Sequence, residues 1–227
     1  WFAPERGAAT ALRIMLGGRT AGRPFVALED INLDIRAGHR VGVVGNNGAG
    51  KTTLLKTLAG VYRPSAGELT VNGDLTMLAG LGSGMLEELT VEENAILYAA
   101  IHGVSRRRMV QHMSDMLAWA ELSDFASTRL KNLSTGMRTR LAFSTMRYID
   151  KDVYLMDEAL TAGDKSFAGR CEAVFDDYQK SGRTFVVASH NLDFVQRFCT
   201  HVLWLQCGRV AGYGPPDEVL DQYRQQS

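Results

Sequence analysis

Residues 45–52 read Gly45-Asn46-Asn47-Gly48-Ala49-Gly50-Lys51-Thr52, which is the pattern GxxxxGK(S/T). Glycines at these spacings let the backbone curl until successive N–H groups point at the oxygens of a phosphate. Lys51 would add a positive charge near the β and γ phosphates, and Thr52 would offer a hydroxyl to Mg²⁺. We expect the next residue, Thr53, to contact the nucleotide as well. The stretch therefore predicts a phosphate loop that binds ATP with Mg²⁺.

The residues on both sides of this loop have the patterns of a strand and a helix. Val41–Val44 is a short, continuous apolar run, typical of a strand buried on both faces. A helix is expected from the loop to about Ala59, so that its free N–H groups face the same phosphate. By chance, this pattern would occur in about one chain in a hundred of this length. A chance match would not be expected to lie between a buried strand and a helix. The context therefore favours nucleotide binding over chance.

Further along the chain, strands and helices alternate. Val153–Asp157 and Thr184–Ser189 are predicted to be buried strands, with a helix near Phe167–Lys180 between them. Apolar residues alternate with polar ones over residues 31–35, as in a half-buried strand, and Glu68–Val71 is predicted to be another short strand. These patterns predict an α/β fold with a mixed sheet, flanking helices and an antiparallel β portion.

The remaining segments complete the plan of one domain over residues 1–227. His201–Leu205 and Arg209–Tyr213 are predicted to form a hairpin, followed by a helix over Asp217–Gln225. We expect a flexible N-terminal insert over residues 1–24, with one short helix near Ala8–Leu16. The α/β core is predicted to comprise residues 25–90 and 150–227, interrupted by an α-helical subdomain over residues 91–149.

Composition narrows the class of protein. Twenty-five Lys and Arg residues balance 25 Asp and Glu residues, so the chain has no global electrostatic reason to bind nucleic acid. An apolar content of 45% is sufficient for a large core. The longest apolar run covers Ala95–Ile101, whereas a membrane span needs roughly 20 residues. The three cysteines form no CxxC pair, which argues against a metal cage or a disulfide framework and favours a cytosolic protein.

Two carboxylates follow a predicted buried strand. The apolar residues 153–156 run directly into Asp157 and Glu158, and burying charges at such a place is costly unless they have a function. Asp157 could hold Mg²⁺, usually through water, and Glu158 could orient or deprotonate an attacking water. The alternative is an ordinary strand end with solvated acids. The phosphate loop about a hundred residues earlier favours the functional interpretation.

Two weaker signals lie at other element ends. Ser134 can cap a helix, and Gly136 leaves its N-terminus open, so the segment LSTGM could bind a second anion. A plain capped helix explains the same residues. His190 follows the strand at 184–189 and could contact a phosphate or hold the catalytic water, although a lone histidine is often only a polar loop residue. The sequence by itself leaves these alternatives open.

Taken in order, the motifs resemble the nucleotide-binding subunit of ABC transporters. They are the phosphate loop, LSTGM, VYLMDE, the step Gly163-Asp164 and the pair Ser189-His190. Residues 134–144 (STGMRTRLAFS) and 161–171 (TAGDKSFAGRC) look like those of the ATPases that export capsular polysaccharide, O-antigen or teichoic acid. The resemblance covers nearly the whole chain from Phe25 onward and implies a P-loop ABC ATPase core.

The resemblance also implies how the motifs act. Two subunits would sandwich two ATP molecules, with the phosphate loop of each facing the LSTGM segment of the other. That segment, called the signature segment below, consists of Leu133, Ser134, Thr135, Gly136 and Met137. Lys51, Glu158 and His190 would be catalytic, with Glu158 as the general base and His190 on the γ-phosphate. Thr52 and Asp157 would hold Mg²⁺, and Gly163 and Asp164 would lie at the dimer seam.

The implied partners are a second copy and an integral membrane transport subunit, at the cytoplasmic face of the bacterial inner membrane. The implied function is the ATP-hydrolysing subunit of an exporter of cell-surface polysaccharide, which contacts the membrane peripherally through its partner and binds no nucleic acid. One alternative is an ABC ATPase for another cargo, such as a lipid, drug or oligosaccharide. Another is a soluble ABC ATPase that acts on ribosomes or DNA.

Three departures from the family pattern stand out. Residues 53–110 contain no glutamine, and Leu86 takes the place of the glutamine that normally touches Mg²⁺. The signature segment reads LSTGM rather than LSGGQ. The strand that normally carries an adenine-stacking aromatic is missing, so that Trp1 or Phe2 would take this role, with Phe25 as an alternative and plain packing as a further explanation.

Overall fold

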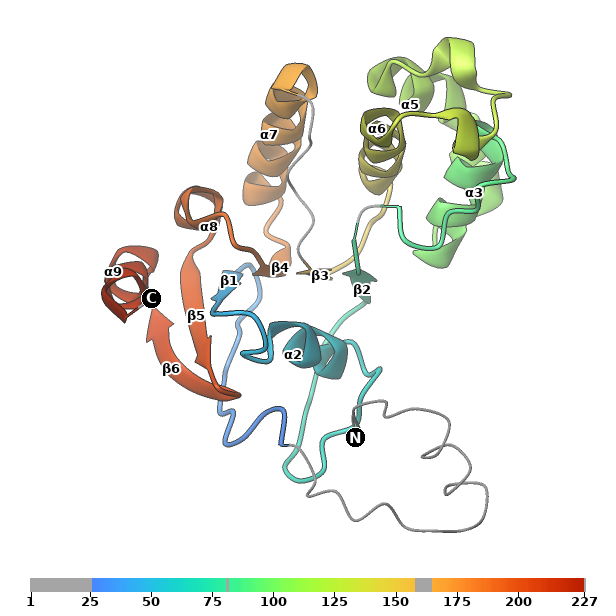
Figure 1. Cartoon of the computed structure of the whole chain (residues 1–227). Coiled ribbons are helices and arrows are strands. Elements are labelled where there is room, and N and C mark those ends of the chain that lie inside the picture. Colours follow the sequence, from blue (N-terminus) through green and yellow to red (C-terminus); the bar gives the residue numbers. More distant parts are fainter. Residues whose placement is uncertain (1–25, 81, 158–164, 227) are drawn as a thin grey trace, which may run out of the picture.

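The computed structural model describes residues 26–80, 82–157 and 165–226. Its centre is one six-stranded sheet (Figure 1). The strands, in sheet order, are β2 (Leu75–Leu78), β3 (Val153–Asp157), β4 (Thr184–Ala188), β1 (Arg40–Val44), β5 (His201–Gln206) and β6 (Arg209–Gly214). Neighbouring strands are parallel except β5 and β6, which form the predicted antiparallel hairpin. The mixed α/β fold class is therefore confirmed.

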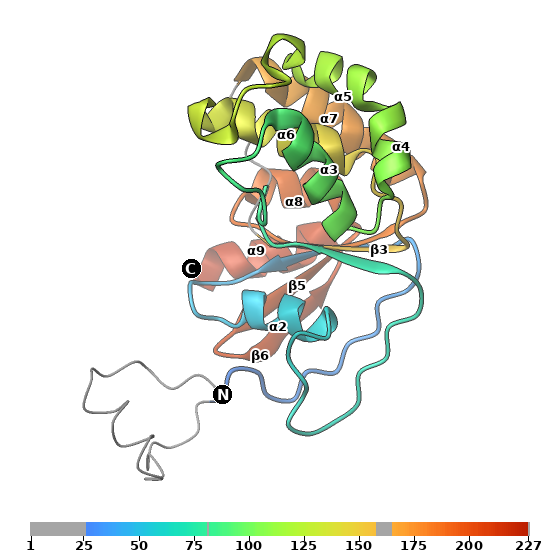
Figure 2. The same cartoon turned by 90° about the vertical axis from the view of Figure 1, so that its right-hand side faces the viewer.

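Helices cover both faces of this sheet. They are α2 (Lys51–Leu58), α3 (Val91–Ile101), α4 (Arg106–Gln111), α5 (Met113–Ala120), α6 (Thr135–Met146), α7 (Lys165–Lys180), α8 (Leu192–Phe198) and α9 (Pro216–Gln226), with short 3₁₀ turns at Ser123–Phe125 and Leu130–Asn132. Figures 1 and 2 show α2 on one face and α7 and α8 on the other. A strand that is covered on both faces has no solvent-exposed side, which is why β1 and β4 are largely apolar runs.

Successive strand residues serve the two faces in turn. Val41, Val43 and Leu155 pack with α2, through Leu54 and Leu55. Tyr154 and Met156, on the opposite face of β3 from Leu155, belong to the larger core beneath α7 and the lobe of helices α3 to α6. Phe143 and Phe167 are part of the same core. Burying each such side chain contributes about 1.5–3 kcal/mol. The sheet is thus held from both sides, which fixes the edge where β1 and β3 end.

Helices α3 to α6 gather in a lobe beside α7 (Figure 1). They fall within the predicted helical segment 91–149, although the predicted subdivision of the chain remains a prediction. Thr90 begins α3 with a reciprocal capping box, in which its hydroxyl accepts from Glu93 N and the Glu93 carboxylate accepts from Thr90 N. No helix in the described ranges is long and apolar enough to cross a membrane.

Two predicted strands are wrong. Residues 31–35 and Glu68–Val71 are not strands in the structure. Ile31, Leu33 and Ile35 are half-buried while the residues between them are exposed, so the predicted alternation exists. The side chains pack on the core beside α2, but no ladder of hydrogen bonds forms with a neighbouring strand in the described part of the chain. Among these residues, the antiparallel portion is limited to β5 and β6.

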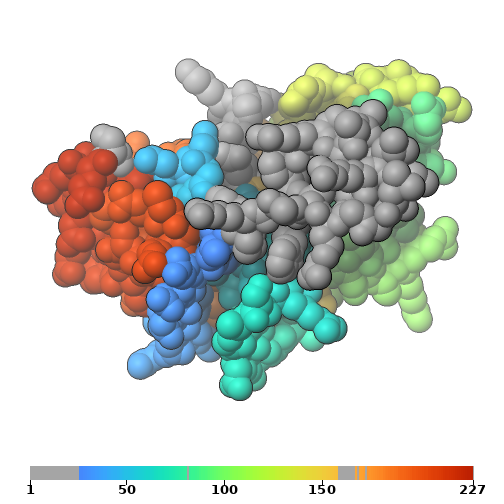
Figure 3. All heavy atoms as spheres, turned by 60° about the horizontal axis from the view of Figure 1, so that its bottom comes forward, coloured from blue at the N-terminus to red at the C-terminus, as the bar shows by residue number. Residues whose placement is uncertain are grey.

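Figure 3 shows the face of the molecule to which these segments belong, with the blue segment after residue 25 and the teal segment before β2 both at the surface. Val61, Leu69 and Val71, which lie between α2 and β2 in the chain, are exposed. The predicted insert 1–24 and its short helix lie outside the described residues.

Candidate nucleotide-binding site

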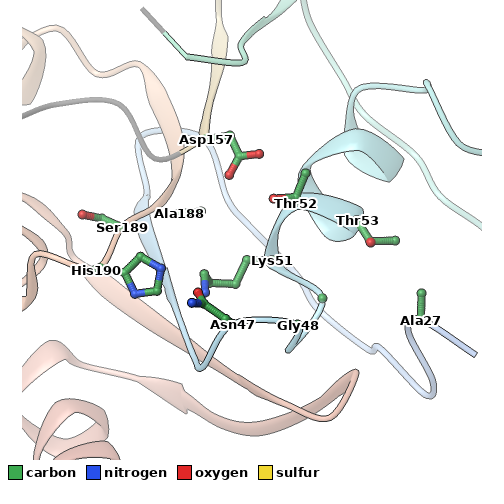
Figure 4. A pocket seen from close by; sticks show the side chains of 11 residues that line it. Ala27, Asn47, Gly48, Lys51, Thr52, Thr53, Asp157, Ala188, Ser189 and His190 are labelled. Atoms are coloured by element: carbon green, nitrogen blue, oxygen red, sulfur yellow. The ribbon is translucent and has the colours of Figure 1, made fainter. Parts of the chain in front are cut away.

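The phosphate loop lies between the end of β1 and the start of α2, as predicted. Gly45, Gly48 and Gly50 have positive φ angles of 148°, 81° and 108°, which turn the chain from the strand into the helix. Helix α2 begins at Lys51, so its free N–H groups open toward the loop. A cavity lies against this turn (Figure 4). It is lined by Ala27, Asn47, Gly48, Gly50, Lys51, Thr52, Thr53, Asp157, Ala188, Ser189 and His190.

Other parts of the chain pack closely beneath two of the loop glycines. A Cβ on Gly45 would lie 2.2 Å from the carbonyl oxygen of Leu205 in β5. A Cβ on Gly50 would lie 2.8 Å from Leu28 Cδ2. The loop is therefore seated directly on β5 and on the segment that precedes β1, which holds its N–H groups in place before any ligand arrives.

We expect Gly45→Ala to lower the free energy of unfolding by about 2–4 kcal/mol, because it combines an unfavourable φ with a clash against backbone. Gly182→Ala is the matched control, since Gly182 has a φ of 68° and a Cβ there would meet no heavy atom within 4 Å. The control should lose only about 1 kcal/mol. Urea denaturation of both variants measures the difference, and equal losses would contradict the role of the Leu205 contact.

Lys51 is held by the carbonyls of its own loop. Its Nζ donates to Gly45 O at 2.6 Å and to Asn46 O at 3.2 Å. Both acceptors are neutral oxygens, so a phosphate that entered the cavity would compete for the ammonium group with full negative charges. The lysine thus lies where the predicted role needs it.

The carboxyl ends of β3 and β4 bring the predicted acid and histidine to the same cavity. Asp157 pairs with Ala188, so Asp157 and the residues just after β4 share one edge of the sheet. Figure 4 shows Lys51, Thr52, Asp157 and His190 around one space. A hydroxyl and a carboxylate oxygen are hard ligands of the kind that Mg²⁺ prefers. Thr52 and Asp157 therefore fit the predicted metal pair.

The turn that carries His190 is anchored locally. Asn191 Oδ1 accepts from Phe194 N at 3.0 Å and caps α8, while Asn191 N donates to Ser189 Oγ at 3.1 Å. These bonds fix the chain on both sides of His190, whose side chain is exposed at the cavity. Asn191 is not among the predicted site residues, although an Asn before an apolar helix start is a recognisable capping signal.

Ala27 is a second residue of the site that was not predicted from the sequence. It lines the cavity, and a Cβ on Gly208 would lie 2.6 Å from Ala27 O. Glu29 N donates to Gly208 O at 2.8 Å. The β5–β6 turn therefore presses the segment 27–29 against the phosphate loop, and no local sequence signal could have shown this contact.

The signature segment does not meet the phosphate loop of its own chain. Ser134 Oγ accepts from Met137 N at 3.2 Å, so the predicted cap of α6 is present. No residue from Leu133 to Met137 lines the described cavity. Helix α6 belongs to the lobe on one side of the sheet and α2 lies on the other (Figures 1 and 2). Within one chain, the two predicted anion sites are separate.

The loop around Leu86 is tied to α3 by a buried asparagine. Leu86 is 54% exposed, but its N–H donates to Asn94 Oδ1 at 2.7 Å and its carbonyl accepts from Asn94 Nδ2 at 2.9 Å. Asn94 is fully buried in α3. Nearby, Lys131 bonds Glu88 at 2.9 Å, and this hydrogen bond and charge lower the pKa of Glu88. Whether Leu86 replaces the family's glutamine stays a prediction.

The other predicted site residues lie outside the described residues. They are Trp1, Phe2, Phe25, Glu158, Gly163 and Asp164. The roles proposed for them, namely adenine stacking, general-base catalysis and contact across a dimer seam, therefore stay predictions.

Comparison with known proteins decides the family. A family profile described as ABC transporter matches residues 28–161, which include the phosphate loop, the signature segment and Asp157. The chain belongs to the ABC transporter family. In Klebsiella pneumoniae, the O-antigen export system ATP-binding protein RfbB is 34% identical over 90% of this chain and 83% of its own length.

Other relatives extend beyond the matched region. RfbB of Myxococcus xanthus is 37% identical over 88% of this chain but 46% of its own length. The teichoic acids export ATP-binding protein TagH of Shouchella clausii is 36% identical over 88% of this chain and 56% of its own length. This member of the ABC transporter family thus spans about half the length of these two relatives.

Solved structures share the fold. The ATP-binding subunit of an ABC transporter has a TM-score of 0.73 and 24% identity, with 87% of both chains covered. The ATP-binding cassette MJ0796, in a dimeric post-hydrolysis state bound to ADP and Pi, has a TM-score of 0.69 and 21% identity, with 84% of this chain and 90% of that chain covered. At these identities the likeness concerns the fold alone.

Proposed function

We propose that this chain binds ATP with Mg²⁺ and hydrolyses it as the energy-supplying subunit of an ABC transporter that exports a cell-surface polysaccharide. The observation that carries the proposal is the meeting of Lys51, Thr52, Asp157 and His190 around one cavity against a helix N-terminus. The positive charge of Lys51, the helix dipole and the oxygen ligands of Thr52 and Asp157 lie at one place, which suits a bound nucleoside triphosphate.

Each side chain has a role that follows from its chemistry. Lys51 leaves Gly45 O and Asn46 O to hold the β and γ phosphates. Thr52 and Asp157 would hold Mg²⁺, which when bound neutralises charge that develops on the phosphates. His190 holds the γ-phosphate from the other side of the cavity. Glu158, one residue after Asp157, accepts a proton from the attacking water.

The site is completed by a second copy of the chain. The signature segment lies apart from its own phosphate loop, and a capped helix N-terminus is suited to the γ-phosphate of a nucleotide held by a partner. Gly163 and Asp164 would lie at the seam between the copies. Closure of this homodimer on two ATP molecules drives transport, and hydrolysis lets it reopen.

The cargo follows from the relatives. RfbB is an ATP-binding protein of O-antigen export and TagH is an ATP-binding protein of teichoic acids export, and both kinds of cargo are cell-surface polymers. An ATPase for another cargo, or a soluble ABC ATPase, is not favoured by these relatives. The chain would dock on an integral membrane subunit through its helical lobe and lie peripherally at the cytoplasmic face of the inner membrane.

Deletion of the gene in its host should remove the long surface glycan, and wild-type protein should restore it. The gene for the Asp157→Asn variant should not restore it at equal protein level, because the metal ligand is lost. The measurement is gel analysis of extracted surface polysaccharide, with co-purification of the chain and an integral membrane protein as a second readout. An unchanged glycan in the deletion strain would refute the cargo, and recovery with ribosomes or DNA would refute the transporter assignment.

A further inference from the structure

Arg138, near the start of α6, joins three segments by one guanidinium group. Its Nη1 donates to Glu87 Oε1 at 2.8 Å, its Nη2 to Lys131 O at 3.2 Å and its Nε to Leu133 O at 3.3 Å. The Arg138 side chain is 34% exposed and that of Glu87 is 65% exposed, so the ion pair is open to water, whereas the bond to Leu133 O is partly buried. Two of the three acceptors are backbone carbonyls just before Ser134, the cap of α6.

These carbonyls belong to the turn that sets the direction of the signature segment. Residues Leu130–Asn132 form a 3₁₀ turn, and Leu133 N donates to Leu130 O at 3.0 Å. The chain then reverses into α6 at Ser134, where φ is −66° and ψ is 160°. Arg138 lies one turn into the helix and reaches back to this entry. It therefore fixes where Ser134 stands relative to the helix it caps.

The loop at Glu87 is itself tied to the same turn through its backbone. Leu130 N donates to Leu89 O at 2.9 Å, and Lys131 N donates to Glu87 O at 3.1 Å. Buried Asn94 holds the other side of this loop, through its bonds to Leu86, and thereby fixes it against α3. The backbone at Glu87 is thus tied both to this turn and, through Leu86, to α3, although the Glu87 side chain itself is 65% exposed.

We propose that Arg138 is a positioning residue that holds the signature segment in the orientation needed to act on a partner's nucleotide. This rests on the proposed function, in which Ser134 to Gly136 complete the site of a second copy. Arg138 does not line the nucleotide cavity of its own chain. Its removal should therefore leave ATP binding to one chain intact and impair the steps that need dimer closure.

The planar fork of arginine explains why lysine would be an incomplete substitute. Lysine at this position keeps the positive charge opposite Glu87, but its single ammonium cannot span the carboxylate and both carbonyls in the same way. Comparing Arg138→Ala with Arg138→Lys therefore separates the contribution of the positive charge from that of the planar guanidinium geometry. Arg129→Gln is a matched control, because Arg129 lies directly before the same 3₁₀ turn, is 59% exposed and contacts Glu88 only at 3.5 Å.

The test uses the purified full chain with MgATP. For Arg138→Ala, we expect kcat for ATP hydrolysis to fall at least about tenfold, since small misplacements of a catalytic group have effects of this size. We expect about a threefold fall for Arg138→Lys and a change within about twofold for Arg129→Gln. The dissociation constant of a non-hydrolysable ATP analogue for the monomer should stay within about twofold in all variants.

A second readout does not depend on turnover. In a Glu158→Gln background, ATP-dependent dimer formation measured by sedimentation should weaken about tenfold on adding Arg138→Ala, as expected for lost pre-organisation. Wild-type kcat and wild-type dimerisation in Arg138→Ala would overturn the proposal, as would a parallel loss of nucleotide binding. If Arg138→Ala does not fold, Arg138→Lys decides by the same two measurements. Absence of hydrolysis in the wild-type chain would refute the proposed function, and the dimerisation readout would then decide on Arg138 alone.

Discussion

Lys51→Met should lower ATP affinity by about a hundredfold and ATP hydrolysis by about a hundred- to a thousandfold, the range seen when one donor to developing charge is removed. Methionine fills nearly the same volume but carries no charge. The ammonium that now bonds Gly45 O and Asn46 O would be missing where the phosphate charge is concentrated. Fluorescent ATP binding and phosphate release measure the two losses.

Lys56→Met is the matched control for Lys51→Met. Lys56 lies in the last turn of the same helix, faces the Tyr62 ring at 5.7 Å and does not line the cavity. It makes the same change in net charge, so a general electrostatic effect would appear in both variants. We expect wild-type binding from the control. Equal losses in the two variants would contradict a specific contact between Lys51 and phosphate.

The parts of this site that could be predicted from the sequence are those made by consecutive residues. The phosphate loop joins β1 to α2 over residues 45–52, and its glycine spacing alone determines where the N–H groups turn. Asp157 and His190 were predictable for a related reason. Each comes at or just after the carboxyl end of a parallel strand, and such ends meet at one edge of the sheet.

Predictions that depended on a contact with a distant part of the same chain were less reliable. Alternation over residues 31–35 correctly predicted which side chains are buried, but a strand also needs a neighbour's hydrogen bonds, and alternation does not reveal a neighbour. The contact of Ala27 with the β5–β6 turn joins residues far apart in the chain. Arg138 and Glu87 are likewise 51 positions apart, so no local pattern marks them as a pair.

The signature segment shows a different limit. The sequence predicted its cap correctly, yet one chain cannot show what a helix start faces in an assembly. The structure separates Ser134 from the cavity, and this separation is what the proposed homodimer explains. The position of Ser134 relative to a second copy depends on how the two copies assemble, and the pattern of one chain does not contain that arrangement.

Glu158→Gln should leave ATP binding unchanged and lower hydrolysis by about a hundred- to a thousandfold, the range expected for a lost general base. Glutamine keeps the size and hydrogen-bonding capacity of glutamate but cannot accept the proton of an attacking water. Asp157 lines the cavity at the end of β3, and Glu158 is the next residue along the chain. Single-turnover hydrolysis, with ATP binding measured in parallel, separates the chemical step from affinity.

Glu218→Gln provides the same chemical change at an exposed position of α9 that does not line the cavity, and it should hydrolyse ATP at the wild-type rate. Since Glu158→Gln would bind ATP without consuming it, the closed dimer should accumulate and elute as a dimer only when ATP is present. Lys51→Met should not form that dimer, because closure requires nucleotide between the two copies. Full turnover in Glu158→Gln would remove its role as the base, whereas slow turnover without an ATP-dependent dimer would refute the arrangement in which the signature segment acts on the partner's nucleotide.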